Sequence, residues 1–281
     1  MIEVKNVSYT YMSGGPFETA ALKNVSLSLT DGEFIGLMGH TGSGKSTLVQ
    51  IIGGLEKPTE GSVVIDGQTL HSKECDMRAM RFKIGLVMQY PEYQLFEETV
   101  FRDIAFGPTN MGLSEQEIRD RVELAADLAG VKRELLEKSP FELSGGQKRR
   151  AAIAGILAMQ PKILILDEPT AGLDPAGREE LLHKIRDLHK RLGITVLFVS
   201  HSMEDIASMA DRIIVMNRGE AVMSGRPGEI FSRAEQLRGM GLSVPGITDI
   251  CDGLRKRGMP LPEGIYTMDR AVSEIERLLK K

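Results

Sequence analysis

Residues 39–46, with the sequence GHTGSGKS, restrict the fold of this chain more than any other segment. The apolar stretch EFIGLM precedes this glycine-rich loop, and a helical pattern of apolar residues follows it, at Leu48, Ile51, Ile52 and Leu55. A strand, a glycine-rich loop and a helix in this order are what a phosphate-binding P-loop requires, because the glycines let backbone N–H groups turn toward phosphates at a helix N-terminus. The residues expected to bind the nucleotide are Gly39, His40, Thr41, Gly42, Ser43, Gly44, Lys45, Ser46 and Thr47.

Two acidic residues, Asp167 and Glu168, follow the apolar run ILIL. Adjacent carboxylates at the end of a buried strand are costly to desolvate unless a cation or hydrogen-bond donors satisfy them. Together with the P-loop they predict a Mg²⁺ site, in which the Ser46 hydroxyl and Asp167 are the metal partners and Lys45 holds the β- and γ-phosphates. Glu168 is then placed to polarise the attacking water. Without the P-loop, the same residues would indicate only a strand that ends at Pro169.

Composition excludes several classes of protein. With 281 residues, of which 42% are hydrophobic and 26% charged, the chain is expected to be globular. The formal net charge of -4 gives no overall attraction for nucleic acid, and no nucleic-acid partner is expected. Cys75 and Cys251 lie far apart, which argues against a metal cluster and favours a reducing cytoplasm. The N-terminus has no signal-peptide pattern, and no apolar run is long enough to span a membrane.

Apolar stretches that alternate with helical patterns predict an α/β fold. ILILD and TVLFVS are continuously apolar, as in parallel strands covered on both faces, whereas VSLSLT alternates and indicates an antiparallel β subdomain. Residues 100–160 show no strand pattern, so a helical subdomain is expected at about 90–160. There, Ser114 and Glu117 form the capping-box pattern of a helix whose buried face comprises Ile118, Val122, Ala125 and Ala129.

The composition shifts toward Gly, Pro and Met beyond about residue 225. Two amphipathic patterns follow, at 247–254 and 271–279. We therefore expect a first domain at 1–225 and a small C-terminal helical extension at 226–281.

The segment LSGGQ, residues 143–147, would by itself indicate only a helix that Ser144 caps. The chain also has Tyr11 near its start, the P-loop, Gln89, ILILDEP, AGLD ending at Asp174, and His201 after TVLFVS. In order and spacing these motifs resemble the ATP-binding cassette (ABC) family of ATPases, from residue 1 to about 225. The resemblance implies a P-loop NTPase core and ATP and Mg²⁺ as ligands.

The resemblance also implies a head-to-tail dimer. In such a dimer Ser144, Gly145, Gly146 and Gln147 of one subunit cover the γ-phosphate bound by the other subunit, and Asp174 crosses the interface. His201 would contact the γ-phosphate, Gln89 would touch Mg²⁺ or the attacking water, and Tyr11 would stack on adenine. Two alternatives stay open: Tyr9 is a second aromatic in the same strand, and Asp174 could cap the helix that begins near Pro175.

Residues 89–100, QYPEYQLFEETV, resemble the energy-coupling factor (ECF) ATPases within the ABC family. FELSGGQKRR and the tail PLPEGIYTMDRAVSEIERLL are similar to the same group, and the pattern is nearest to the second ATPase of its heterodimeric pair. This implies an importer of a micronutrient, a vitamin or a transition-metal ion, with this chain a peripheral protein on the cytoplasmic face of the cell membrane. The implied partners are a second ABC ATPase (a paralogue, or a copy of this chain), a transmembrane coupling subunit and a membrane substrate-binding subunit.

Two other functions remain open from the sequence. One is an ABC importer of another subtype, and the other is a soluble ABC ATPase that acts outside transport.

The residues after Gln89 are expected to contact the membrane subunit. Pro91 restricts the backbone there, so that movement at the nucleotide could reach the next element. An apolar groove with an acidic rim would then receive a basic helix, although any single glutamate could instead be a solvated residue at a helix start. The expected contact residues are Glu92, Tyr93, Leu95, Phe96, Glu97 and Glu98.

Overall fold

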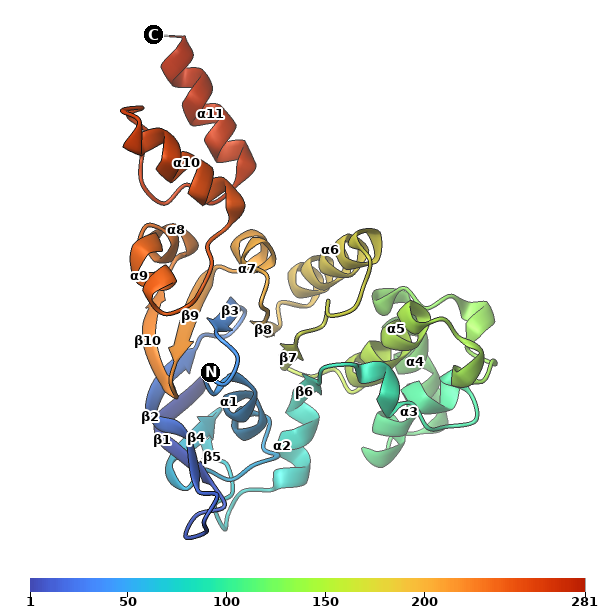
Figure 1. Cartoon of the computed structure of the whole chain (residues 1–281). Coiled ribbons are helices and arrows are strands. Elements are labelled where there is room, and N and C mark those ends of the chain that lie inside the picture. The colour runs from blue at the N-terminus through green and yellow to red at the C-terminus, as the bar shows by residue number, and fades with distance from the viewer. Residues whose placement is uncertain (281) are drawn as a thin grey trace.

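The computed structural model describes residues 1–280, which form two β-sheets surrounded by helices (Figure 1). The larger sheet has the strand order β10-β9-β3-β8-β7-β6 and is parallel except for β10, which pairs antiparallel with β9. The smaller sheet is antiparallel, in the order β2-β1-β4-β5. The strands are β1 (Ile2–Tyr11), β2 (Thr19–Leu29), β3 (Phe34–Gly39), β4 (Glu60–Ile65), β5 (Gln68–Thr69), β6 (Ile84–Val87), β7 (Ile163–Asp167), β8 (Thr195–Val199), β9 (Arg212–Asn217) and β10 (Glu220–Gly225).

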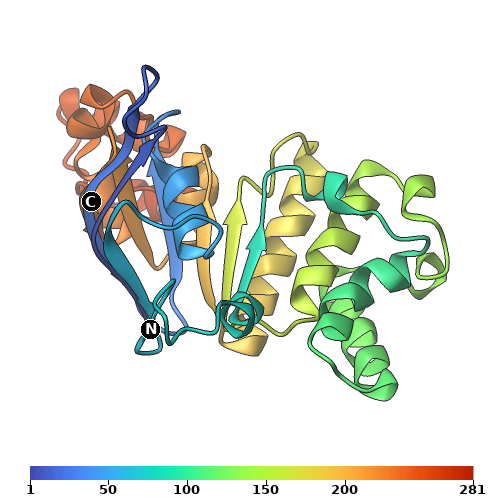
Figure 2. The same ribbon diagram turned by 90° about the horizontal axis from the view of Figure 1, so that it is seen from below.

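The helices lie on both faces of the larger sheet, in the helical subdomain and in the C-terminal part of the chain (Figures 1 and 2). The α-helices are α1 (Lys45–Ile52), α2 (Met77–Lys83), α3 (Val100–Asn110), α4 (Glu115–Ala129), α5 (Gly145–Leu157), α6 (Pro175–Leu192), α7 (Met203–Met209), α8 (Pro227–Phe231), α9 (Ala234–Gly239), α10 (Gly246–Lys256) and α11 (Met268–Leu279). Three short 3₁₀ helices are η1 (Pro91–Gln94), η2 (Arg133–Leu135) and η3 (Pro140–Glu142).

The central strands are buried on both faces, as their continuous apolar sequences predict. Along β7, Leu164 and Leu166 join the apolar core shared with the helical subdomain and α6. Ile163 and Ile165 point the other way, into a second core that α1 shares with the antiparallel sheet. The predicted α/β architecture with an antiparallel β subdomain is therefore confirmed.

The helical subdomain contains α3, α4 and α5, which lie to one side of the sheets in both views (Figures 1 and 2). The predicted capping box is present, with both reciprocal hydrogen bonds between Ser114 and Glu117. On the buried face of α4, Val122, Ala125 and Ala129 are buried as expected, and Ile118 is partly buried.

The predicted apolar stripe of α1 is wrong at its last member. The helix ends at Ile52. Gly54 then adopts a left-handed conformation, with φ of +69°, which reverses the chain direction. Leu55 is consequently 53% exposed.

The packing of the C-terminal region changes at a different residue from its amino-acid composition. Ile230 and Phe231 of α8 belong to the same buried core as the larger sheet, and this core continues through Val244. A separate small core, with Cys251 and Ala271 among its members, lies between α10 and α11. Packing thus changes near residue 245, where the composition had indicated 225. Among residues 1–280, no helix is both long and apolar enough to cross a bilayer.

Candidate active site

The strand order of the larger sheet brings the predicted site residues to one edge. Four strands lie next to one another in the order β3, β8, β7 and β6, and each neighbouring pair among them is parallel. The P-loop follows β3, His201 follows β8, Asp167 ends β7 and Gln89 follows β6. Because parallel strands place their carboxyl ends together, residues from four distant parts of the sequence converge there.

The P-loop has a conformation that glycine alone accepts readily. Gly42 and Gly44 have φ of +80° and +99°. A Cβ atom at Gly44 would lie 2.6 Å from the Ala21 carbonyl oxygen, so the small sheet packs directly against this turn. The Ser43 side chain is fully buried, and its hydroxyl finds no hydrogen-bond partner within residues 1–280. The sequence therefore specifies this loop through both backbone conformation and packing.

Lys45 lies at the first turn of α1 with its side chain folded back across the loop. Its Nζ donates to the carbonyl oxygens of Gly39 and His40, at 2.7 and 3.1 Å. Burial lowers the pKa of Lys45, whereas the carboxylates of Glu168 and Asp167 oppose that shift. The ring of His40 is in turn within hydrogen-bond distance of the Asn217 amide oxygen, 3.1 Å away. These contacts hold the cation inside the curve of the loop.

Tyr11 lies beside the start of α1. Its hydroxyl is 3.0 Å from the Thr47 hydroxyl, and the residue is 40% exposed. Tyr9 is engaged differently: its hydroxyl donates to Glu56 at 2.7 Å, and this bond, with burial, raises the pKa of Tyr9 to about 12. The two rings meet edge to face, 4.8 Å apart. Of the two aromatics, Tyr11 is the one left with an accessible ring next to the P-loop.

Asp167 is almost completely buried, at 6% exposure. Burial raises the pKa of Asp167, although a hydrogen bond from the Ser46 hydroxyl and the Lys45 charge oppose part of that rise. Hard oxygen donors from Ser46 and Asp167, with the Gln89 amide on the neighbouring strand end, suit Mg²⁺. Within the part of the chain that the structure describes, no cluster of three or more His, Cys, Asp or Glu residues could enclose a metal on its own.

Glu168 has a left-handed backbone, with φ of +52°, and a side chain only 13% exposed. Burial raises its pKa to about 7, and the adjacent Asp167 acts in the same direction. The His201 Nε2 atom lies 3.2 Å from Glu168 Oε1, but this oxygen has no partner in hydrogen-bond geometry among residues 1–280. Burial and the Lys45 charge lower the pKa of His201. A pKa of about 7 leaves Glu168 partly ionised at neutral pH, whereas the lowered pKa of His201 favours the neutral form of that ring.

The signature LSGGQ lies away from the P-loop of the same chain. Ser144 caps α5, with a capping box to Gln147, so the cap that the sequence predicts is present. Ser144 and Gly145 are exposed, and no atom lies within 4 Å of a Cβ placed on Gly145 or Gly146. The start of α5 and that of α1 lie apart in both views (Figures 1 and 2). Asp174 is also exposed and caps α6, accepting the Gly177 N–H at 2.7 Å.

Glu92 does not face outward as expected. Its carboxylate accepts two hydrogen bonds from Arg149 of α5, at 3.0 and 2.8 Å, and the two side chains are 15% and 5% exposed. Burial alone would raise the pKa of Glu92, but the bonds from Arg149 outweigh it and lower the pKa. Arg149 also donates to the carbonyl oxygens of Pro169 and Ala171, at 3.0 and 2.7 Å. Sequence reasoning missed Arg149, because no local spacing marks a partner so distant along the chain.

Several other residues of the segment 89–100 are exposed. Gln89 is exposed, and Tyr93 is 83% exposed. Phe96 packs edge to face on Phe106 of α3, with ring centroids 5.0 Å apart, at a groove of about 270 Å³ between α3 and α5. Glu98 is exposed and pairs with Arg102 one turn later. The groove is lined mostly by apolar and small residues, among them Leu95, Phe82, Ala152, Ile156 and Met159.

Comparison with known proteins agrees with this geometry. Residues 22–171 match the family model described as ABC transporter. The energy-coupling factor transporter ATP-binding protein EcfA2 of Caldanaerobacter subterraneus subsp. tengcongensis is 56% identical over 279 residues, covering 99% of this chain and 98% of that protein. The protein of the same name from Clostridium perfringens is 50% identical over 280 residues, with coverage of 99% and 98%.

Two solved structures share the fold over most of this chain. The structure of cbiO1 from Clostridium perfringens, described as part of the ABC transporter complex cbiONQ, aligns with a TM-score of 0.76 and 38% identity, covering 89% of this chain and 98% of that one. The dimeric structure of MJ0796, a bacterial ABC transporter cassette, aligns with a TM-score of 0.72 and 36% identity, with coverage of 80% and 98%.

This chain belongs to the ABC transporter family of ATPases. It binds nucleotide and hydrolyses ATP in connection with transport, as the motifs predicted. Within the family it is an ATPase subunit of the energy-coupling factor type. The predicted family, subtype and fold are thus confirmed, whereas the roles of individual residues rest on the geometry above.

Proposed function

We propose that this chain drives uptake of a micronutrient, a vitamin or a transition-metal ion, by hydrolysing Mg-ATP within a membrane complex. The observation that carries the proposal is the separation of two half-sites. One edge of the sheet holds the P-loop, Glu168, His201 and Gln89, while Ser144 is exposed on the helical subdomain. Each half-site is incomplete without a second cassette.

Hydrolysis requires that a water oxygen bond to the γ-phosphorus while the bond to the β–γ bridging oxygen breaks. Glu168 is positioned to accept hydrogen bonding from that water, and its pKa near 7 suits a general base at neutral pH. Lys45 contacts the phosphates, and His201, beside Glu168, orients toward the γ-phosphate. Ser46, Asp167 and Gln89 would hold Mg²⁺, which neutralises phosphate charge when bound.

The second cassette would complete the site from outside. Ser144 and the N–H groups of Gly145 and Gly146 are free to cover a γ-phosphate on a partner, as helix N-termini commonly do. ATP must favour the closed dimer by about 5 kcal/mol to change it from mostly open to mostly closed. Contacts present only on closure can supply that difference, and Asp174 would lie at the same interface. The partner is a second ATPase, either a paralogue or a copy of this chain.

The groove beside Leu95 and Phe96 is the proposed docking place for a transmembrane coupling subunit. Apolar side chains line this groove together with the carboxylate of Asp103, and Glu97 and Glu98 directly follow Phe96 in the sequence. This combination suits an amphipathic helix with basic residues. Glu92 would contribute to this docking only indirectly, because its side chain forms an ion pair with Arg149 of the same chain. Tyr93, which is fully accessible, would extend the contact. The chain would therefore sit at the cytoplasmic face of the membrane, beside a membrane substrate-binding subunit that selects the cargo.

Charge reversal tests the docking surface. Glu97→Lys with Glu98→Lys should abolish co-purification of the transmembrane subunit from native membranes while ATP binding by the isolated chain persists. The matched control is Glu134→Lys with Glu137→Lys, two exposed acids in the same subdomain. Retention of the complex by the first double variant would move the contact elsewhere.

Mass spectrometry of the purified complex distinguishes the remaining alternatives. A periplasmic binding protein in place of a membrane substrate-binding subunit would indicate another importer subtype. A complex with no membrane subunit would indicate a soluble ATPase.

A further inference from the structure

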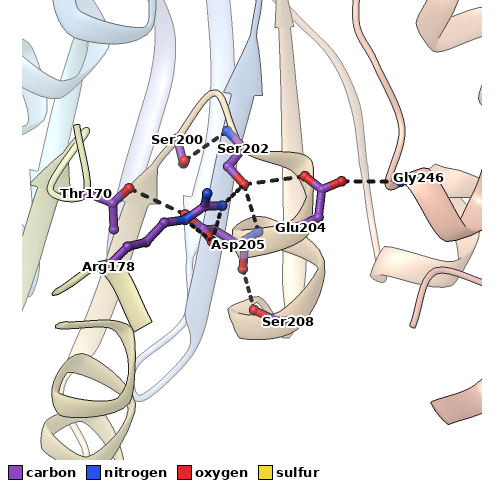
Figure 3. Close-up of polar contacts among 8 residues, drawn as sticks. All are labelled: Thr170, Arg178, Ser200, Ser202, Glu204, Asp205, Ser208 and Gly246. Carbon is purple, nitrogen blue, oxygen red and sulfur yellow. Dashed lines mark hydrogen bonds and ion pairs between the residues drawn. The ribbon is translucent and has the colours of Figure 1, made fainter. Parts of the chain in front are cut away.

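An ion pair between Arg178, whose side chain is 38% exposed, and the buried Asp205 lies beside the proposed catalytic edge. Asp205, in the first turn of α7, has a side chain only 5% exposed. Arg178 of α6 donates to it through Nε, at 3.0 and 3.1 Å from the two carboxylate oxygens, and through Nη2 at 2.7 Å (Figure 3). Two nitrogens of one guanidinium thus meet one carboxylate, a geometry that fixes orientation as well as distance.

The same pair binds the two loops that carry the proposed catalytic groups. Thr170, in the turn that begins at Glu168, donates its hydroxyl to Asp205 Oδ2 at 3.4 Å. Ser202, which follows His201, accepts from the Asp205 backbone N–H at 3.2 Å and from Arg178 Nη2. Figure 3 shows these side chains converging from three separate segments. Arg178 itself lies just after Asp174, at the start of α6.

His201 needs such support, because its own ring is weakly held. The side chain is 55% exposed, and its approach to Glu168 lacks hydrogen-bond geometry. Its position relative to Glu168 is therefore set by the backbone on either side. That backbone is fixed by Ser202 donating its N–H to the Ser200 hydroxyl at 3.0 Å, and by the contacts with Asp205.

We propose that Asp205 and Arg178 are positioning residues for ATP hydrolysis, which hold the segment carrying His201 against the loop carrying Glu168. This rests on the roles proposed above for Glu168 and His201. Stability alone gives little reason for the pair, because an ion pair with one partly exposed partner usually contributes little to the free energy of unfolding. A pair that joins three loops at a reaction site has the additional function of fixing their geometry.

The test is a double-mutant cycle with Asp205→Asn, Arg178→Gln and the double variant, assayed for ATPase turnover. Each single variant should lower kcat about 10- to 100-fold and leave the KM for ATP within about twofold, because a displacement near 1 Å is enough for such a loss while the P-loop is untouched. The double variant should be no worse than about the poorer single variant, since the two residues act as one unit. The matched control is Glu179→Gln, which removes an equal charge from the exposed side chain next to Arg178 on α6; it should keep wild-type kcat.

Three outcomes would overturn the inference. They are additive losses in the cycle, a fall in ATP affinity as large as the fall in kcat, or wild-type kcat in Asp205→Asn. The His201→Ala variant separates a failure of this inference from a failure of the proposed function. Normal turnover in His201→Ala would show that the proposed role of His201 is wrong. Impaired turnover in His201→Ala with normal turnover in Asp205→Asn would show that only the positioning role is wrong. Should Asp205→Asn fail to fold, Thr170→Val removes a single hydroxyl contact to Asp205 and should still lower kcat about threefold or more; unchanged kcat there would also overturn the inference.

Discussion

Replacing Glu168 with glutamine should stabilise the ligand-free protein and stop its turnover at the same time. The carboxyl pKa rises from 4.5 to about 7 on folding, chiefly because the group is buried. The folded state therefore holds its proton more tightly than the unfolded state. It follows that the free energy of unfolding falls as pH rises from 4.5 to about 7, and the full penalty is present above that range.

The shift sets the size of the effect. A change in the Glu168 pKa from 4.5 to about 7 corresponds to a free energy of about 3 kcal/mol. This is an upper limit for the increase in the free energy of unfolding that Glu168→Gln can produce. We expect that gain in urea unfolding of metal- and nucleotide-free protein at about pH 8, shrinking to about 1 kcal/mol or less at about pH 5. Turnover should fall by at least about a hundredfold with ATP binding retained, because the amide cannot act as a base.

Glu92→Gln is the matched control, since its folded pKa is lowered and not raised. The ionised Glu92 carboxylate stabilises the folded protein at pH values above its unfolded pKa, and this stabilisation is lost as pH falls through its folded pKa. The Glu92→Gln variant should therefore be less stable than the wild type at about pH 8. An equal gain for Glu168→Gln at both pH values would show that its charge is not the cause. Near-normal turnover in that variant would remove Glu168 from the role of base.

Three further outcomes follow from the nucleotide site. The chain contains no tryptophan, so Tyr11→Trp introduces a single fluorophore whose emission should change on ATP binding; an unchanged spectrum at saturating ATP would place adenine elsewhere. Gly44→Ala should abolish ATP binding measured by calorimetry, because its Cβ would meet the Ala21 carbonyl at 2.6 Å in a backbone with φ of +99°. Ser144→Ala should lower turnover at least about tenfold and leave ATP binding by the isolated chain unchanged, since Ser144 is proposed to act on the partner's nucleotide; weakened binding would argue against that division.

The candidate nucleotide residues could be located from the sequence because each motif is continuous along the chain. A P-loop is specified by glycines in one short run between a strand and a helix, and Asp167 and His201 each end a strand whose apolar pattern is plain. Leu55 was misassigned because periodicity continues through Gly54, where the backbone turns. The predicted boundary at 225 follows the change in composition, whereas α8, which lies beyond it, still packs in the main core.

Glu92 shows the other limit of sequence reasoning. Its charge and its place beside Pro91 indicate an exposed helix start, and locally that expectation is sound. Its partner, Arg149, is 57 positions away, and the two meet only because α5 packs against η1. Whether a carboxylate points outward or inward thus depended on a tertiary contact that no local pattern encodes.

The Glu92–Arg149 pair also joins the segment 89–100 to both proposed half-sites. Arg149 lies on the helix that Ser144 caps, and it donates to two carbonyl oxygens in the turn after Glu168. Arg149→Met should destabilise the protein by about 3 to 5 kcal/mol, because it leaves Glu92 buried without its cation. Adding Glu92→Gln should restore part of that loss in urea unfolding, since the unpaired charge is then gone.

Measuring transport and ATP hydrolysis together tests whether the Glu92–Arg149 pair only stabilises the fold or also couples hydrolysis to transport. In the assembled complex, Arg149→Met with Glu92→Gln should keep ATP binding and lower transport more than ATP hydrolysis, because the segment 89–100 no longer moves with α5. The control is the same double variant in the isolated chain, whose basal hydrolysis should fall less than transport does. Equal losses of transport and hydrolysis would contradict transmission through this pair, since the defect would then lie in the chemical step that both activities share.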